Sequence, residues 1–194
     1  MNENGSLAGI RTVSLLDNDP NQVAITKELI DIDNECFDGM ADADEGDLDY
    51  WLKNRSASFV ELLLDGKQII GYIDFLTLSE TGVKKLKAGD WRDGMIDDSC
   101  LSDKKQSAMS LYALSMAIKK EYRGLGLSKR LWNSARERFM RENHRIKDVY
   151  GIVWTAAGRG FLKAFDPQII NHDFAGHPII VIKTQDGKLP EIKK

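Results

Sequence analysis

The residues with the clearest potential for chemistry lie in one short segment, from Met116 to Leu131. Its central part reads Arg123-Gly124-Leu125-Gly126-Leu127-Ser128, so that two glycines stand directly before a predicted helix. Glycine allows a backbone to approach a ligand closely and to adopt positive φ, and a helix start offers N–H groups that have no partner within the helix. The pattern therefore predicts a pocket for phosphate or pyrophosphate, although short glycine patterns also occur in ordinary turns before helices.

The helix after the glycine loop is marked both at its start and along its length. We expect Ser128 to cap it, and Leu127 and Trp132 to pack across the cap as a hydrophobic staple. Apolar residues recur on one side with helical spacing, at Leu131, Ala135 and Phe139. The other side is basic and carries Arg136, Arg138 and Arg141. The pattern predicts an amphipathic helix whose arginines face solvent.

The elements that must position this segment follow from alternation, helical spacing and turn residues. Strands are expected at 10–16, 58–64, 68–78, 107–118, 147–154, 169–170 and 178–184. Helices are expected after the turn at 17–20 and up to Phe37, at 47–55, after the glycine loop and at 156–165. The dipeptide Asp65-Gly66 predicts a tight hairpin between the second and third strands.

The connection 79–106 is unusually long, and a short helix is expected within it at 83–88. It is rich in carboxylates, at Asp90, Asp93, Asp97, Asp98 and Asp103. One interpretation is a flap on the substrate side whose carboxylates attract a cationic amine. The other is a solvated insertion without a role in binding.

The strand at 107–118, the glycine loop and the helix together resemble the acetyl-CoA-binding motif of the GNAT superfamily of N-acetyltransferases. That motif is a strand, then Arg/Gln-x-x-Gly-x-Gly/Ala, then a helix; Arg123 and Gly126 match it, and Ser128 stands where glycine or alanine is usual. The resemblance covers about 10–184 and implies the fold class α/β (α+β): a mixed, mostly antiparallel sheet of six to seven strands, flanked by helices and splayed between its fourth and fifth strands.

The resemblance also implies acetyl-CoA as the cofactor and no metal. The pantetheine arm would lie in the splay like a short added strand, and the N–H groups of the glycine loop would hold the pyrophosphate, with Arg130 adding positive charge. The implied cofactor-binding residues are Met116, Ala117, Ile118, Arg123, Gly124, Leu125, Gly126, Leu127, Ser128 and Lys129.

The reaction implied by the resemblance is direct attack of a primary amine on the thioester in a ternary complex, with N–H groups near Ala117 and Ile118 polarising the carbonyl. Histone-type relatives carry a glutamate base at the position of Tyr112. Tyr112 is therefore the catalytic candidate, ordering a water or donating a proton, because tyrosine is a poor base at neutral pH. A packed core aromatic is the alternative. The tyrosine that many relatives carry on the short helix after the fifth strand is replaced by Leu162, and the preceding asparagine by Thr155.

Other titratable residues remain open as bases, although each has a structural interpretation as well. Asp74 and Glu61 lie on predicted strands, where either could be an ordinary exposed residue. His172 and His177 lie in a late loop, and their spacing does not indicate a metal site.

Composition limits the class of protein further. Hydrophobic residues make up 42% and charged residues 29%, typical of a soluble globular chain, and the net charge of −3 argues against a nucleic-acid-binding surface. Residues 1–9 lack the features of a secretory signal, and no apolar run is long enough to span a bilayer. We expect a tail at 1–9, a single domain at 10–184 and a second tail at 185–194.

The two cysteines, Cys36 and Cys100, are far apart in sequence and show no metal spacing, which favours a reducing cytoplasm. We expect Cys36 to lie in the core and Cys100 to be the more exposed thiol. The expected partner is a small-molecule or peptide amine, cationic if the acidic segments 38–49 and 90–103 contact it. Neither a membrane nor a nucleic acid is expected, and a homodimer is left open.

Three functions fit these observations. The first is an acetyl-CoA-dependent N-acetyltransferase acting on a primary amine. The second is a non-catalytic, regulatory acyl-CoA-binding domain of the same fold, which the leucine at Leu162 favours. The third is a nucleotide-binding module, which the absence of a Gly-x-x-x-x-Gly-Lys-Ser/Thr pattern disfavours.

Overall fold

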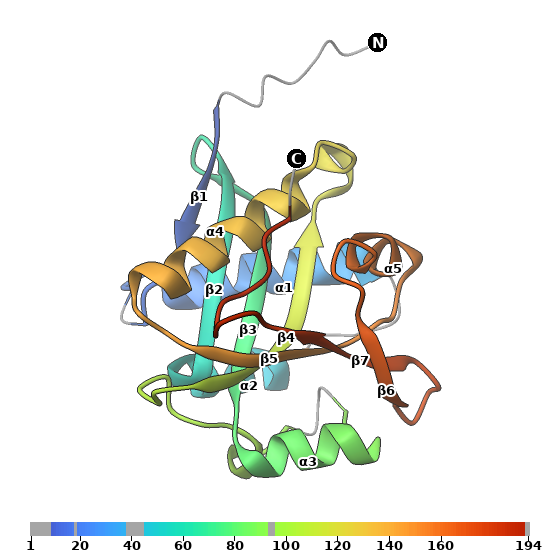
Figure 1. The fold of residues 1–194 in the computed structure, drawn as a ribbon. Coiled ribbons are helices and arrows are strands. Elements are labelled where there is room, and N and C mark those ends of the chain that lie inside the picture. Colours follow the sequence, from blue (N-terminus) through green and yellow to red (C-terminus); the bar gives the residue numbers. More distant parts are fainter. Residues whose placement is uncertain (1–8, 18, 38–44, 93–95, 193–194) are drawn as a thin grey trace.

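The computed structural model describes residues 9–17, 19–37, 45–92 and 96–192. In this part of the chain, seven strands form one sheet in the order β1-β2-β3-β4-β5-β7-β6 (Figure 1). The β4–β5 pair is parallel and the other neighbours are antiparallel. The strands are β1 (Ile10–Ser14), β2 (Ser58–Asp65), β3 (Gln68–Leu78), β4 (Met109–Ile118), β5 (Ile146–Ile152), β6 (Gln168–His172) and β7 (Pro178–Lys183). The mixed, mostly antiparallel sheet that the resemblance implied is confirmed.

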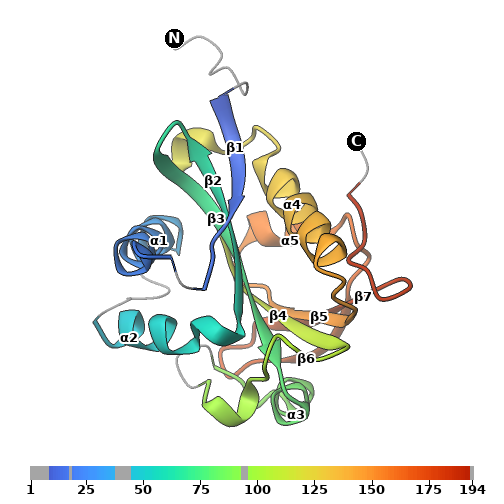
Figure 2. The same cartoon turned by 90° about the vertical axis from the view of Figure 1, so that its left-hand side faces the viewer.

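The helices lie on both faces of this sheet (Figure 2). They are α1 (Gln22–Phe37), α2 (Glu45–Lys53), α3 (Glu80–Ala88), α4 (Leu127–Arg141) and α5 (Ala156–Leu162). Helix α1 packs Leu29 and Ile32 against one face, whereas α4 packs Leu131, Ala135 and Phe139 against the other. The apolar residues that recur with helical spacing in the sequence of α4 therefore form the buried side of that helix.

The hairpin between β2 and β3 forms where the sequence predicts it. Gly66 has φ +61 in the two-residue turn, a conformation that glycine adopts without steric cost. The two strands pair from Asp65 with Gln68 to Ser58 with Leu76. Strand β4 pairs with the β3 side of this hairpin.

Strand β4 is paired on both sides over only half of its length. Its pairing with β3 extends to Ile118, whereas its pairing with β5 ends at Ala113. The β3–β4 register also shifts between Asp74 and Phe75, opposite Leu114. The sheet is therefore splayed from Leu114 to Ile118, as the resemblance implied.

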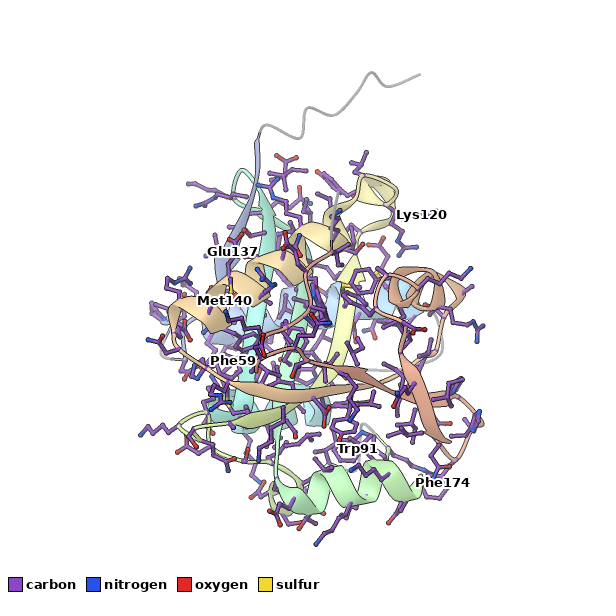
Figure 3. All side chains as sticks on the ribbon, in the orientation of Figure 1. Phe59, Trp91, Lys120, Glu137, Met140 and Phe174 are labelled. Carbon is purple, nitrogen blue, oxygen red and sulfur yellow. The ribbon has the colours of Figure 1, made fainter. Side chains whose placement is uncertain are left out.

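The long connection 79–106 buries several of its side chains in the core, so it is not solvated throughout. Ser79 caps α3 by accepting a hydrogen bond from the N–H of Gly82, and Gly89 ends that helix with φ 78. Beyond it, Trp91, Ile96 and Cys100 pack with other buried residues beneath the sheet, and Figure 3 shows Trp91 between α3 and the strands. Cys100 is buried, which corrects the expectation of an exposed thiol.

The carboxylates of this connection have internal partners. Asp97 pairs with Lys85, and Asp98 pairs with Lys53. Hydrogen bonds from Ser99 and Lys85 lower the pKa of Asp97 well below its ordinary value. The first pair joins α3 to the segment that follows it, and the second joins this segment to Lys53 at the end of α2. Asp93 and the acidic segment 38–44 lie outside the described residues.

The C-terminal segment 185–192 packs against α4, which corrects the expectation of a frayed tail there. Trp132 donates its indole N–H to the carbonyl of Pro190 at 2.8 Å, and Arg136 donates to the carbonyl of Leu189 at 3.0 Å. Leu189 is itself buried. The N-terminal tail expected at 1–9 lies outside the described residues except for Gly9.

Arg138 is buried in the interior, which corrects the expectation of three solvent-facing arginines on α4. Its guanidinium lies 3.3 Å from the carboxylate of Glu61 on β2 and 3.0 Å from that of Glu142. Glu61 also accepts hydrogen bonds from Ser14 and Ser134. This charged network joins β1, β2 and α4.

Candidate active site

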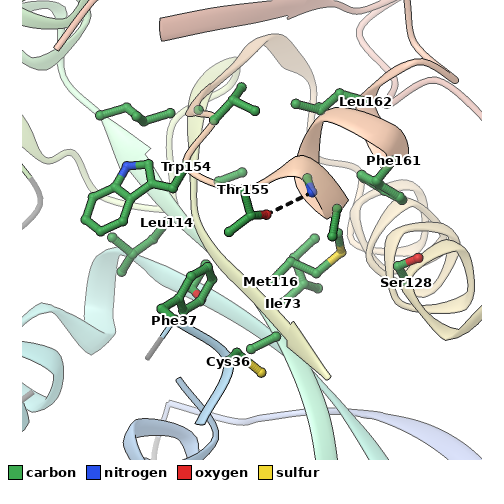
Figure 4. Close-up of a pocket in the computed structure, with 18 of the residues that line it drawn as sticks. Cys36, Phe37, Ile73, Leu114, Met116, Ser128, Trp154, Thr155, Phe161 and Leu162 are labelled. Atoms are coloured by element: carbon green, nitrogen blue, oxygen red, sulfur yellow. Dashed lines mark hydrogen bonds between the residues drawn. The ribbon is translucent and has the colours of Figure 1, made fainter. Parts of the chain in front are cut away.

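A cavity of about 1170 Å³ opens where β4 and β5 diverge. Its floor is the unpaired half of β4, and its sides are the end of α1, the start of α4 and helix α5 (Figure 4). Figure 4 shows Met116, Phe37 and Trp154 around the same space, with Ser128 at the start of α4. The splay of the sheet thus creates a single chamber that adjoins the glycine loop.

The free edge of β4 presents backbone groups to this chamber. Lys119 donates its N–H to the carbonyl of Ile70 on β3, and Ala117 is paired with Tyr72. Because successive residues of an antiparallel strand point their backbone groups in opposite directions, Met116 and Ile118 direct theirs away from β3. Ala117 lines the cavity, but its N–H is directed to β3. The open backbone groups are therefore those of Met116 and the N–H of Ile118, because the carbonyl of Ile118 accepts hydrogen bonds from Arg123 and Cys36.

The glycine loop has the geometry of an anion cradle. Gly124 and Gly126 have φ of +80 and +73, and a Cβ at either position would meet nothing within 4 Å. Gly126 is the N-cap of α4, and no side chain caps that helix. The prediction of Ser128 as the cap is therefore wrong, since the helix begins at Leu127, whose side chain joins Trp132 in the core. The first-turn N–H groups lack a side-chain acceptor, which suits a phosphate.

Most of the residues predicted to hold the cofactor line the cavity. They are Met116, Ala117, Ile118, Arg123, Gly124, Gly126, Leu127 and Ser128. Leu125 and Lys129 are not among the lining residues, and Leu125 is 42% exposed. Arg123 donates from Nε to the carbonyl of Ile118 at 2.9 Å and from Nη2 to Sγ of Cys36. Its guanidinium therefore ties the end of β4 to α1.

Tyr112 is not part of this chamber, contrary to the prediction of a catalytic role. Its side chain is buried in the cluster that contains Trp91, with the two ring centroids 5.0 Å apart, and it is not among the residues that line the cavity. The other predicted bases on strands are also occupied elsewhere. Asp74 accepts a hydrogen bond from Ser58, and Glu61 belongs to the network of Arg138. The structure supports the interpretation of Tyr112 as a packed core aromatic.

Helix α5 forms one wall of the chamber. Thr155 caps it, its hydroxyl accepting the N–H of Gly158 at 3.0 Å. Leu162 lines the cavity, so an aliphatic side chain stands where the resemblance implied a tyrosine. This wall supplies no acid from that position.

His177 lies in the cavity wall, whereas His172 does not. Nδ1 of His177 is 3.0 Å from Oδ2 of Asp173, and its ring stacks on Trp154 with centroids 5.5 Å apart. Burial alone would raise the pKa of Asp173, but hydrogen bonds from His177 and from backbone N–H groups lower it. The four-residue spacing of Asp173 and His177 was the available sequence signal for this pair.

Asp33 is a cavity residue that the sequence pattern did not single out. Its Oδ1 accepts hydrogen bonds from the hydroxyls of Tyr72, at 2.5 Å, and Ser115, at 2.6 Å. Burial raises the pKa of Asp33, and these two hydroxyls partly offset that rise. The available signal was an acidic residue directly after Ile32, on the helix side that carries Leu29.

Two further observations concern membranes and metals. In the part of the chain that the structure describes, no helix combines the length and apolar character of a bilayer span. Among the same residues, no three His, Cys, Asp or Glu side chains gather as a set of metal ligands.

Comparison with known proteins identifies the family of this chain. A model described as the acetyltransferase (GNAT) family matches residues 26–163. A comparison with curated proteins finds no significant match.

Solved structures share the fold. An aminoglycoside acetyltransferase from an uncultured soil metagenomic sample, in complex with sisomicin, is 12% identical with a TM-score of 0.59, covering 86% of this chain and 96% of that one. The PaiA N-acetyltransferase of Thermoplasma acidophilum, in complex with coenzyme A, is 11% identical with a TM-score of 0.54, covering 90% and 99%.

A GNAT-family acetyltransferase of Staphylococcus aureus Mu50 is 15% identical with a TM-score of 0.58, covering 91% and 99%. At such low identity, these likenesses show the fold alone. The family match spans most of the chain and includes the splayed strand, the glycine loop and α4. This protein belongs to the GNAT family of acetyltransferases.

Proposed function

We propose that this protein is an acetyl-CoA-dependent N-acetyltransferase whose acceptor is a primary amine. The observation that carries the proposal is the continuity between the free edge of β4 and the glycine loop within one cavity. A strand edge and an uncapped helix start are complementary to an amide-bearing arm that ends in a pyrophosphate. The open space beside Gly124 and Gly126 fits the same group.

Each part of the cavity then has a chemical task. Acetyl-CoA supplies the activated acetyl group. The N–H groups of the loop and of the first turn of α4 hold the pyrophosphate, and those of Met116 or Ile118 polarise the thioester carbonyl. Trp154 and His177 enclose the other side, which limits access of water. Attack by the amine nitrogen forms the amide and releases the thiol.

Thermal stability with added ligand tests the cofactor. Acetyl-CoA at 100 times its Kd should stabilise the folded state by about 2.7 kcal/mol, which corresponds to a rise in Tm of about 5–10 °C for a chain of this size. ATP and NAD serve as controls and should give little shift. A shift with ATP but none with acetyl-CoA would favour the nucleotide-binding alternative.

One observation favours a second candidate, a regulatory acyl-CoA-binding domain of the same fold. Leu162 and Tyr112 leave two expected catalytic positions without a group that faces the cavity and could transfer a proton. Such a domain would give the same thermal shift with acetyl-CoA. Turnover with any primary amine separates the two candidates, because only the enzyme releases free thiol in proportion to acetylated product.

A further inference from the structure

Asp33 occupies a position in the cavity that the proposed cofactor site leaves unexplained. It comes from α1 and reaches across to Ser115 on the splayed half of β4. Ser115 precedes Met116, whose backbone faces the open side of the strand. The carboxylate of Asp33 therefore lies in the cavity wall beside the part of β4 where the splay begins.

The carboxylate is held in place by neutral donors. The hydroxyls of Tyr72 and Ser115 both bond to Oδ1, and the rings of Tyr72 and Trp51 meet edge to face at 6.2 Å. Within the described residues, no lysine, arginine or histidine forms an ion pair with Asp33. A carboxylate in a cavity wall that lacks a cationic partner in its own chain is a natural receptor for the ammonium group of a substrate.

We propose that Asp33 binds the acceptor amine and is the general base of the acetyl transfer. This inference rests on the proposed function. It also defines the acceptor: a primary amine on an apolar or aromatic body, because the described walls around Asp33 include Phe37, Trp51 and Leu114.

The proton balance of the reaction is simple. The substrate ammonium gives one proton to Asp33, which later passes it to solvent, and the amine becomes nucleophilic. Its lone pair forms the C–N bond, and the C–S electron pair leaves with the thiol sulfur. The second proton lost by nitrogen goes to that sulfur, so the products are the amide, the free thiol and one proton.

The electrostatic surroundings agree with this task. A carboxylate whose pKa is raised by burial is a stronger base than an ordinary aspartate. The other titratable groups facing this region are Tyr72 and Asp74 on β3, and Cys36 on α1 with Arg123 beside it. Burial raises the pKa of Tyr72 well above its ordinary value, so this phenol stays neutral and donates a hydrogen bond to Asp33.

The test compares Asp33→Asn with Asp31→Asn, an exposed aspartate on the same helix. With an amine that the wild-type protein acetylates, Asp33→Asn should lower kcat by about 100- to 10,000-fold, and Asp31→Asn should leave it unchanged. Both variants should keep the thermal shift with acetyl-CoA. The raised pKa means that ionised Asp33 weakens stability at neutral pH, so Asp33→Asn should melt no lower than wild type at pH 7.

The pH profile distinguishes a base from a merely structural residue. The wild-type kcat/KM, which reports the ionisation of the free protein, should fall as the pH drops through the raised pKa of Asp33. Asp33→Asn should lack this acidic limb of the pH profile. Ser115→Ala removes a hydrogen bond that lowers this pKa, so its limb should move to higher pH.

Three results would overturn the inference. The first is an Asp33→Asn variant that keeps the wild-type kcat and the acidic limb of the pH profile. The second is a Ser115→Ala variant whose acidic limb lies at the same pH as that of wild type. The third is loss of the acidic limb in His177→Gln while Asp33→Asn retains it. In each case the proposed function would stand, because the wild-type protein would still acetylate the amine. Failure of wild type to acetylate any amine would overturn both proposals.

Discussion

Replacing Arg138 by alanine is expected to lower the free energy of unfolding by about 3–5 kcal/mol, a large share of the stability of an ordinary domain. Arg138 and Glu61 have side chains that are 7% and 2% exposed, and their charged atoms lie 3.3 Å apart. Without the guanidinium, Glu61 would keep a buried negative charge whose remaining donors are the hydroxyls of Ser14 and Ser134. The loss of a compensating charge costs far more than the net value of the pair.

Chemical denaturation measures this effect, and the same helix provides the control. Arg141 is exposed in the last turn of α4, so Arg141→Ala should change the stability by about 0.5 kcal/mol or less. The double variant Arg138→Met with Glu61→Gln removes both charges and should be more stable than Arg138→Ala alone. If Arg138→Ala were as stable as Arg141→Ala, the buried network would have no structural role.

Replacing Gly126 by valine should reduce acetyl-CoA affinity by about 100- to 10,000-fold. The position has φ +73, which costs a β-branched residue about 1–2 kcal/mol and disturbs the N–H groups around it. Loss of two charge-assisted hydrogen bonds to phosphate, at about 1.5–3 kcal/mol each, gives the stated range. The added side chain would also enter the space in which the pyrophosphate is proposed to lie.

Gly66→Val is the matched control for this prediction. Gly66 has φ +61, and a Cβ at this position would meet no atom within 4 Å, as at Gly126, but Gly66 lies in the β2–β3 hairpin away from the cavity. Titration of each variant with acetyl-CoA should show weak binding for Gly126→Val and wild-type binding for Gly66→Val. Equal loss of affinity in both variants would mean that backbone strain, and not the loop site, controls binding.

Local signals were enough to predict most of the elements. The two adjacent residues Asp65 and Gly66 are sufficient to predict the turn between β2 and β3. The glycine loop predicts the start of α4 to within one or two residues. The exact cap could not be read in this way. Both Gly126 and Ser128 are acceptable caps in sequence, and the backbone conformation of Gly126 decides between them.

The errors concern residues whose environment is made by distant parts of the chain. Arg138 has the sequence position of a solvent-facing charge, but its partner Glu61 is 77 residues away. Trp91 and Cys100 belong to a polar, irregular connection whose burial depends on the lower end of the sheet. The burial of these side chains could not be predicted from the residues that neighbour them in the sequence.

In the candidate site, too, residues that are close in sequence could be predicted and residues brought together by folding could not. Residues of the cofactor motif are contiguous, so their placement together in the cavity could be predicted. Tyr112 is a candidate because histone-type relatives carry a base at its position, but the register shift at Leu114 separates its side chain from the face of Met116 and leaves it beside Trp91. Asp33, Ser115 and Tyr72 come from three elements, and only the folded chain brings their oxygen atoms within hydrogen-bonding distance.

The most direct test of the enzymatic function is to incubate the wild-type protein with acetyl-CoA and a panel of primary amines, and to detect the acetylated amine by mass spectrometry. We expect a product about 42 Da heavier than its amine, the mass of an added acetyl group less a proton, formed together with an equal amount of free thiol. Amines with apolar or aromatic bodies should react best. Binding of acetyl-CoA without acetylation of any amine would contradict the enzymatic function and leave a regulatory acyl-CoA-binding domain.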